Sequence, residues 1–131
     1  MTLSLLDANL LVALLSPTHQ HHALAMRWFG EVERLATCTI IEMSFLRFAH
    51  RNGVAVADAV RSIDRLSNVR GHEFWNDDVR PSARSMQGVI GHRQVAAFHL
   101  VALARRHGGR LATFDRGVAA AHPDVVDLGP A

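Results

Sequence analysis

Residues 3–15 form a nearly continuous apolar run that is interrupted by one carboxylate, Asp7, and one amide, Asn9. A buried strand that passes directly into a helix has this pattern. Because an unpaired buried carboxylate is costly, Asp7 must be satisfied by a partner. This run alone leaves two interpretations open: Asp7 caps the following helix, or it binds a metal ion at the carboxyl end of the first strand.

The rest of the sequence repeats this alternation of short strands and helices. We expect strands over residues 3–6, 36–40, 72–75, 110–114 and 125–128. We expect helices over 8–15, 18–34, 41–48, 56–66, 79–87, 94–107 and a short segment that His122 and Pro123 end. Such alternation predicts a single α/β domain over residues 1–131, with a mostly parallel sheet of about five strands and helices on both faces.

Several polar residues are expected to begin helices. Thr18 is a candidate cap for the second helix, because its hydroxyl suits the first turn. Asp77 and Asp78 precede the segment 79–87, so we interpret them as capping and turn residues for a helix there and not as metal ligands.

Three histidines near the start of the second helix suggest a metal cluster at first sight. On a helix, however, His21 and His22 point about 100° apart, and no further Cys or His follows at ligand spacing. We therefore expect these residues and His19 to be solvated or bonded locally, with no structural zinc.

The charge pattern is compatible with a nucleic-acid partner. The chain has 14 basic residues, all of them arginine, and a formal net charge of +2. Arginine binds phosphate through a planar fork and stays charged. The apolar runs are too short to span a bilayer, and the N-terminus lacks the basic region and cleavage site of a signal peptide, so we expect a cytoplasmic protein with no membrane partner.

Three acidic residues follow three of the predicted strands. Asp7 follows the first strand, Glu42 closely follows the second, and Asp115 follows the fourth. In a parallel sheet these strand ends share one edge, where ligands bind. Carboxylates that converge there repel each other unless a cation neutralises them, and oxygen-only ligands select Mg²⁺ or Mn²⁺. Such a site beside a basic surface suits phosphodiester hydrolysis.

Five short segments carry a further signal, namely residues 5–9, 22–23 with Trp28, 41–42, 91–95 and 111–117. In their order and spacing they resemble PIN-domain ribonucleases, and more narrowly the VapC-type toxins of bacterial toxin–antitoxin pairs. The resemblance implies a three-layer PIN-like sandwich and a metal-dependent endoribonuclease that cuts structured RNA such as tRNA or rRNA. It also implies a homodimer that is neutralised by a cognate antitoxin encoded beside it.

On this hypothesis, Asp7, Glu42 and Asp115 are the catalytic and metal-binding residues. Asp7 and Asp115 would bind Mg²⁺ or Mn²⁺, and Glu42 would orient or help activate the attacking water. Asn9 and Thr113 would support these carboxylates through hydrogen bonds. The candidate contacts to RNA phosphates are Arg47, Arg51 and Arg93.

One position departs from the family pattern. After Gln94 and Val95 the pattern has a small or polar residue and then an aspartate, whereas this chain has Ala97. Alanine has no metal-binding atom, and His99 lies about 200° further round the helix, so we expect metal affinity and turnover to be impaired. Ala97 is either natural, in a weakened or inactive family member, or a deliberate Asp→Ala change that lets a toxic nuclease be expressed.

Two other function classes remain open. The first is a non-catalytic PIN-like module that engages a partner peptide or RNA and uses the acidic pocket to receive an arginine. The second is a phosphohydrolase acting on small molecules, since other α/β folds use an aspartate after the first strand as a nucleophile. Asn9 stands where such an enzyme would carry a second aspartate, which counts against it.

Overall fold

A computed structural model describes residues 2–128 of the chain. Its strands are β1 (Leu3–Leu6), β2 (Arg34–Cys38), β3 (His72–Trp75), β4 (Arg110–Thr113) and β5 (Val126–Leu128). Its helices are α1 (Ala8–Leu15), α2 (His22–Glu31), α3 (Thr39–Arg51), α4 (Val56–Ser67), α5 (Gln94–Arg106) and α6 (Arg116–Ala121). The longest of these helices have 13 residues, and none in the described part of the chain is long and apolar enough to cross a membrane.

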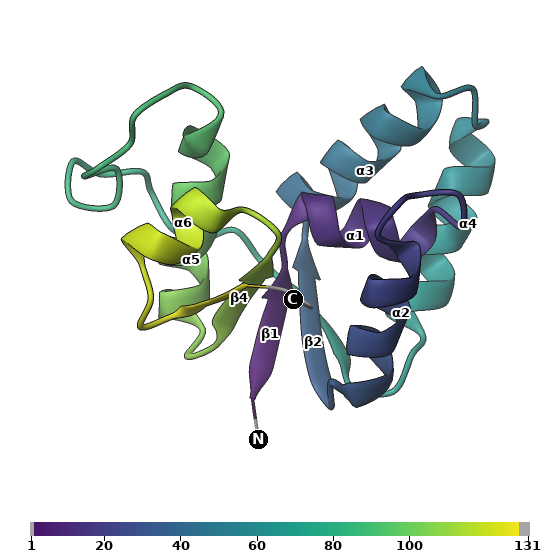
Figure 1. Cartoon of the computed structure of the whole chain (residues 1–131), viewed down its shortest axis with the longest axis horizontal. Helices are drawn as coiled ribbons and strands as arrows, with labels where there is room; N and C mark the ends of the chain where they lie inside the picture. The colour runs from purple at the N-terminus through teal and green to yellow at the C-terminus, as the bar shows by residue number, and fades with distance from the viewer. Residues whose placement is uncertain (1, 129–131) are drawn as a thin grey trace.

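The strands form one parallel sheet in the order β3-β2-β1-β4-β5. Leu5 of β1 is aligned with Ala36 on one side and with Leu111 on the other, and all three are buried. Strands that are covered on both faces need apolar side chains in both directions, which explains their continuous apolar runs. Helices α5 and α6 lie on one side of the sheet and α1 to α4 on the other (Figure 1), as the predicted α/β sandwich requires.

The connections place a ligand-binding edge beside the central strand. From β1 the chain adds β2 and then β3 on one side, and after α5 it adds β4 and β5 on the other side of β1. Parallel α/β sheets bind ligands outside the carboxyl ends of their strands where the strand order reverses. Here that point lies at the ends of β1 and β4, next to Asp7 and Asp115.

The second strand lies two residues earlier than the sequence predicted. β2 ends at Cys38 and α3 begins at Thr39, although residues 36–40 are rich in β-branched side chains. Packing outweighs that local preference, because Ile41, Phe45 and Ala49 are buried at helical spacing. The shift keeps Glu42 in the first turn of α3, as expected.

The prediction that a helix begins at Thr18 is wrong. Residues 17–21 form turns instead, with the His19 amide donating to the Ser16 carbonyl at 2.9 Å and the His22 amide to the His19 carbonyl at 3.0 Å. α2 begins only at His22 and buries a single residue fully, Ala25. The apolar face that drives helix packing therefore starts after the histidines.

The predicted helix over 79–87 is also wrong. The chain forms only a short turn there, in which the backbone amides of Ser82 and Ser85 each donate to the other's hydroxyl at 3.0 Å. Local side-chain bonds of this kind compete with helix formation. The segment has few apolar side chains to bury, so tertiary packing does not extend the turn into a helix.

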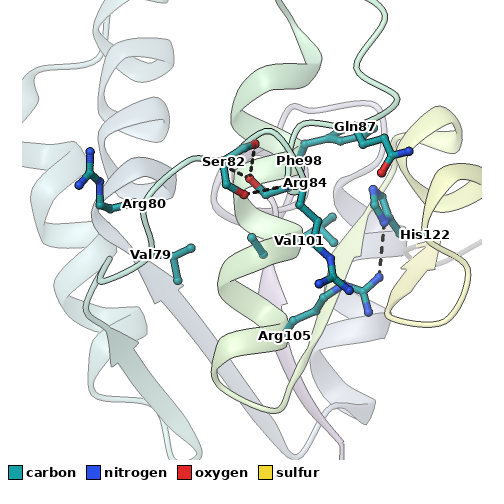
Figure 2. Close-up of a pocket in the computed structure, with 11 residues that line it drawn as sticks. Val79, Arg80, Ser82, Arg84, Gln87, Phe98, Val101, Arg105 and His122 are labelled. Atoms are coloured by element: carbon teal, nitrogen blue, oxygen red, sulfur yellow. Dashed lines mark hydrogen bonds between the residues drawn. The ribbon is translucent and has the colours of Figure 1, made fainter.

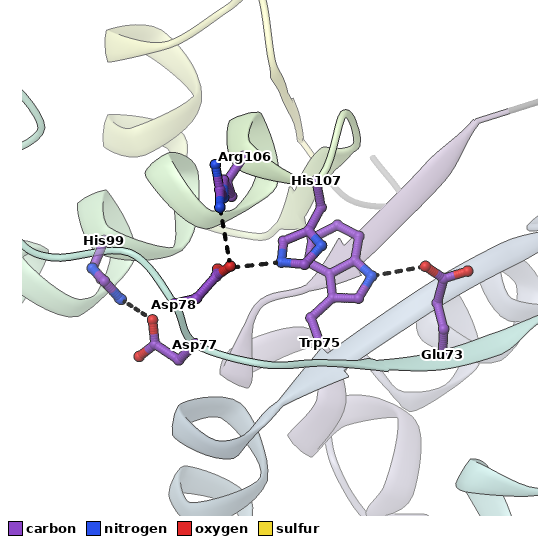
Figure 3. A network of polar contacts seen from close by, with 7 residues as sticks. All are labelled: Glu73, Trp75, Asp77, Asp78, His99, Arg106 and His107. Carbon is purple, nitrogen blue, oxygen red and sulfur yellow. Dashed lines mark hydrogen bonds and ion pairs between the residues drawn. The ribbon is translucent and has the colours of Figure 1, made fainter.

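Asp77 and Asp78, predicted to cap that helix, contact α5 instead (Figure 3). Asp77 Oδ1 lies 2.7 Å from Nε2 of the buried His99. Asp78 pairs with Arg106 at 3.4 Å and lies 3.8 Å from His107 Nε2. With no helix beginning after them, the two acids fix the loop that follows β3 to α5.

Candidate functional site

Asp7 occupies the junction of β1 and α1, which confirms the prediction that it caps the helix. It is the N-cap of α1, and its Oδ1 accepts a hydrogen bond from the Ala8 amide at 2.7 Å. Its other oxygen, Oδ2, accepts from the Thr113 hydroxyl at 2.7 Å. The side chain thus caps the helix and also faces the end of β4 at the edge of the sheet.

The Thr113 hydroxyl connects the two halves of the site. Besides donating to Asp7, it accepts hydrogen bonds from the Asp115 amide at 3.0 Å and from Asn9 Nδ2 at 3.2 Å. Asn9 Oδ1 in turn accepts from the Phe114 amide at 3.2 Å. These bonds hold the ends of β1 and β4 in one arrangement, with Asn9 and Thr113 both beside the carboxylates.

Asp115 is the N-cap of α6. Its Oδ1 accepts hydrogen bonds from the amides of Gly117 at 2.9 Å and Val118 at 3.2 Å. A β-carbon placed on Gly117 would lie 3.3 Å from both Asp115 Oδ1 and Gln94 Nε2. The N-terminus of α5 therefore approaches the turn that carries Asp115.

Burial and charge both act on Asp7. Burial raises the pKa of its carboxyl above the ordinary value, and the nearby charge of Asp115 raises it further. The hydrogen bonds from Thr113 and Ala8 lower the pKa of Asp7 but do not outweigh burial. A cation bound near both carboxylates would lower the cost of charging the buried one.

Glu42 is held by a neighbour that the sequence did not reveal. Its Oε2 accepts a hydrogen bond from the Thr37 hydroxyl at 2.7 Å, and Thr37 Oγ1 lies 2.8 Å from His72 Nε2. Thr37 is fully buried in β2. The sequence did contain one signal of this contact, because Thr37 is a polar residue within an apolar strand and buried polar groups are normally paired.

The site around these carboxylates is incomplete as a metal centre. Within residues 2–128, no three His, Cys, Asp or Glu side chains are placed to share one metal ion. Ala97 is only 8% exposed and offers no donor, and His99, two residues on, is bonded to Asp77. The oxygen donors of Asp7 and Asp115 fit a hard divalent cation in kind.

The three candidate RNA contacts are exposed. Arg47 and Arg51 lie on α3, and Arg93 is the residue just before α5. In the described part of the chain, none of the three forms an ion pair. Their guanidinium groups are therefore available to an anionic partner.

A cavity of about 590 Å³ lies elsewhere, on the outward side of α5 (Figure 2). Arg84, Arg105 and His122 line part of it, over a floor that includes Phe98. Arg105 is already paired with Asp124 at 2.7 Å. None of the predicted carboxylates lines this cavity, so it is separate from the candidate active site.

Comparison with known proteins gives consistent results for sequence and fold. Residues 4–122 match the model of the PIN domain family. The chain is 41% identical over 127 residues to Ribonuclease VapC29 of Mycobacterium tuberculosis, and the match covers 96% of each chain. It is 42% identical over 123 residues to Ribonuclease VapC38 of the same species, a match that covers 88% of this chain and 87% of that one.

Among solved structures, the fold resembles Mycobacterium tuberculosis VapC20, a toxin that cleaves the sarcin–ricin loop. The TM-score is 0.70, and the match covers 97% of this chain and 99% of that one. Sequence identity is 17%, so this likeness supports the fold alone.

Proposed function

The chain belongs to the PIN-domain family and is related within it to the VapC ribonucleases, and from this membership we propose that it is a metal-dependent endoribonuclease toxin. One observation carries the proposal. The Thr113 hydroxyl joins the buried Asp7 carboxylate to the amide of Asp115 across the ends of β1 and β4. This contact holds the backbone of Asp115 close to the Asp7 side chain, at the sheet edge where this fold class binds ligands.

Mg²⁺ or Mn²⁺ is the cofactor in this proposal. Asp7 and Asp115 would hold the ion, and when bound it supplies an activated water and neutralises charge that develops on the phosphate. Glu42 would orient the water from the first turn of α3, using the carboxylate oxygen that does not accept from Thr37. Asn9 and Thr113 would keep the two aspartates in place.

The proposed substrate is structured RNA, such as tRNA or rRNA. Arg47, Arg51 and Arg93 would contact its phosphates, since all three are exposed and arginine pairs well with phosphate oxygens.

Ala97 sets the expected level of activity. Its side chain is packed in α5 and provides no ligand, so the ion would be held by fewer carboxylates than in the family pattern. We propose that this chain binds metal weakly and turns over slowly as a result. A site with one carboxylate fewer also carries less negative charge to attract a divalent ion.

A regulatory partner and a dimer complete the proposal. We propose that a cognate antitoxin encoded beside this chain neutralises it in the cytoplasm, and that the chain forms a homodimer. Several large apolar side chains are exposed and would contribute to such interfaces: Met26, Met43, Val54, Val56, Val60, Ile90 and Val95. Size-exclusion chromatography with light scattering distinguishes a dimer from a monomer.

Cleavage of total cellular RNA tests the enzymatic proposal. The unaltered chain should cleave slowly with Mg²⁺ or Mn²⁺ and not at all in EDTA, and Asp115→Asn should abolish cleavage. Asp64→Asn is the matched control, because Asp64 is an exposed aspartate on α4 outside the site. Cleavage that persists in EDTA, or that Asp115→Asn leaves intact, would contradict metal-dependent hydrolysis at this edge.

A second candidate function has specific support. Ala97 lacks a donor and Glu42 is bonded to Thr37, which together favour a non-catalytic module that binds a partner peptide or RNA. In that case Asp7 and Asp115 would receive an arginine of the partner. Calorimetry separates the two functions: the module binds its partner in EDTA with unchanged affinity and shows no Mn²⁺ binding.

A further inference from the structure

The loop between α1 and α2 brings a row of aromatic rings to the edge that carries the carboxylates. The His19 and His21 ring centroids are 5.7 Å apart, and His21 lies 5.2 Å from the ring of Phe114 with an interplanar angle of 35°. Phe114 directly precedes Asp115. The row therefore begins beside the candidate catalytic site and continues away from it over the loop.

Hydrogen bonds to the backbone hold the segments that carry this row. The His21 amide donates to His19 Nδ1 at 3.0 Å, and His22 Nδ1 lies 2.9 Å from the Ala13 carbonyl, which ties the loop to α1. On the other side, the Phe114 amide donates to Asn9 Oδ1 at 3.2 Å. All three rings of the row are partly exposed, so they combine a fixed position with access from solvent.

The chemistry of the row is that of a stacking surface. Acceptance of the His21 amide by Nδ1 places the proton of a neutral His19 ring on Nε2. Burial lowers the pKa of His19, and the neighbouring His21 and His22 lower it further, which favours this neutral form. Within residues 2–128 the histidines also form no group that could share a metal ion. A row of aromatic rings next to carboxylates is poorly suited to phosphate and well suited to the faces of nucleobases.

We propose that His19, His21 and Phe114 form a stacking surface for unpaired RNA bases that adjoin the phosphate which a metal ion at Asp7 and Asp115 would bind. This inference rests on the proposed function and adds a binding role for side chains outside the carboxylate site. It specifies that the RNA presents single-stranded nucleotides there, because bases within an A-form helix keep their faces covered by their neighbours. Phe114 would contact the base nearest the catalytic edge, and His21 and His19 would contact those further along.

Fluorescence of a single-stranded RNA oligonucleotide that contains 2-aminopurine tests this role, since stacking on a protein ring changes its emission. Binding is measured in EDTA, so that no metal-dependent cleavage occurs. Phe114→Leu and His21→Leu keep a side chain of comparable size but remove the ring, and each should weaken binding about tenfold and abolish the fluorescence change. Phe114→Trp and His21→Phe retain a ring and should preserve both.

Phe74→Leu is the matched control, because Phe74 is an exposed phenylalanine on the edge strand β3. It should leave binding and fluorescence unchanged. If Phe114→Leu does not fold, His21→Leu decides, since His21 lies in a surface turn. Wild-type affinity and fluorescence in the leucine variants, or no fluorescence change with the unaltered chain, would overturn the stacking surface.

Cleavage with Mg²⁺, measured in parallel, separates this inference from the proposed function. Ring-dependent binding without cleavage would reject the nuclease and keep the stacking surface. Metal-dependent cleavage with ring-independent binding would keep the nuclease and reject the stacking surface.

Discussion

Replacing Thr113 with valine tests how the site is held together. Valine has nearly the same shape as threonine but lacks the hydroxyl that donates to Asp7 Oδ2 at 2.7 Å and accepts from the Asp115 amide at 3.0 Å. Thr113 is fully buried, so water cannot replace the lost hydroxyl at its own position. Thr113→Ser, which keeps the hydroxyl and removes one methyl group, is the matched control.

The expected loss of stability follows from these contacts. A hydrogen bond to a charged group contributes about 1.5–3 kcal/mol, and leaving the Asp115 amide without its acceptor adds to the cost. We expect Thr113→Val to lower the free energy of unfolding by about 2–4 kcal/mol at neutral pH, which corresponds to roughly 10 °C in Tm. Thr113→Ser should cost about 1 kcal/mol, the contribution of one buried methyl group.

The same change should depend on pH with a defined sign. The Thr113 hydrogen bond lowers the pKa of Asp7, so its removal raises the pKa of Asp7 in the folded state further above the unfolded value. A raised carboxyl pKa means that stability is lost as the pH rises through the folded-state pKa. The difference between Thr113→Val and Thr113→Ser should therefore be largest at neutral pH and shrink as Asp7 becomes protonated.

Urea denaturation in EDTA, from pH 8 down to the acid limit of folding, measures this difference. Equal stability of the valine and serine variants at neutral pH would refute the role given to the hydroxyl. A difference that stays constant or grows towards acid pH would refute the link to the ionised Asp7.

Three further predictions follow from other contacts. Thr37→Val should lower the free energy of unfolding by about 1–3 kcal/mol, because it leaves Glu42 and His72 without the hydroxyl that both contact. Urea denaturation measures this loss, and an unchanged stability would show that water replaces the hydroxyl. Gly71→Ala should lower Tm more than Gly53→Ala. Both glycines have positive φ, but only at Gly71 would a β-carbon collide with a neighbouring atom, the Glu33 carbonyl oxygen. Equal decreases in Tm would contradict this packing. Ala97→Asp should lower Tm in EDTA and regain stability with Mn²⁺, and a Tm that does not respond to Mn²⁺ would mean that position 97 does not face the metal.

Local patterns were sufficient to predict much of the sheet and its helices. The apolar run around Asp7 predicted β1 over residues 3–6 and α1 over residues 8–15, and the structure has both with the same bounds. The nearly all-apolar segment that begins at Gln94 likewise predicted α5 to within one residue of its end. In both cases burial on several sides leaves a clear signal in a single segment.

The remaining features depend on partners that are distant in the sequence. Thr37 contacts His72 because β3 lies beside β2 in the sheet, and His21 meets Phe114 because the loop between α1 and α2 and the end of β4 lie at the same edge. The segment 79–87 has no strong apolar period, so local capping patterns suggested a helix that tertiary packing does not support. Contacts of this kind can be identified only once the elements are placed relative to one another in the fold.

Cleavage of total cellular RNA by the Ala97→Asp variant, with and without Asp7→Asn, tests the central claim most directly. Folding of both proteins is verified by circular dichroism. We expect Ala97→Asp to cleave RNA with Mg²⁺ or Mn²⁺ faster than the unaltered chain, and Asp7→Asn to abolish that gain. A folded Ala97→Asp protein that cleaves no RNA with either metal, or one whose cleavage survives Asp7→Asn, would contradict a carboxylate metal site at the ends of β1 and β4.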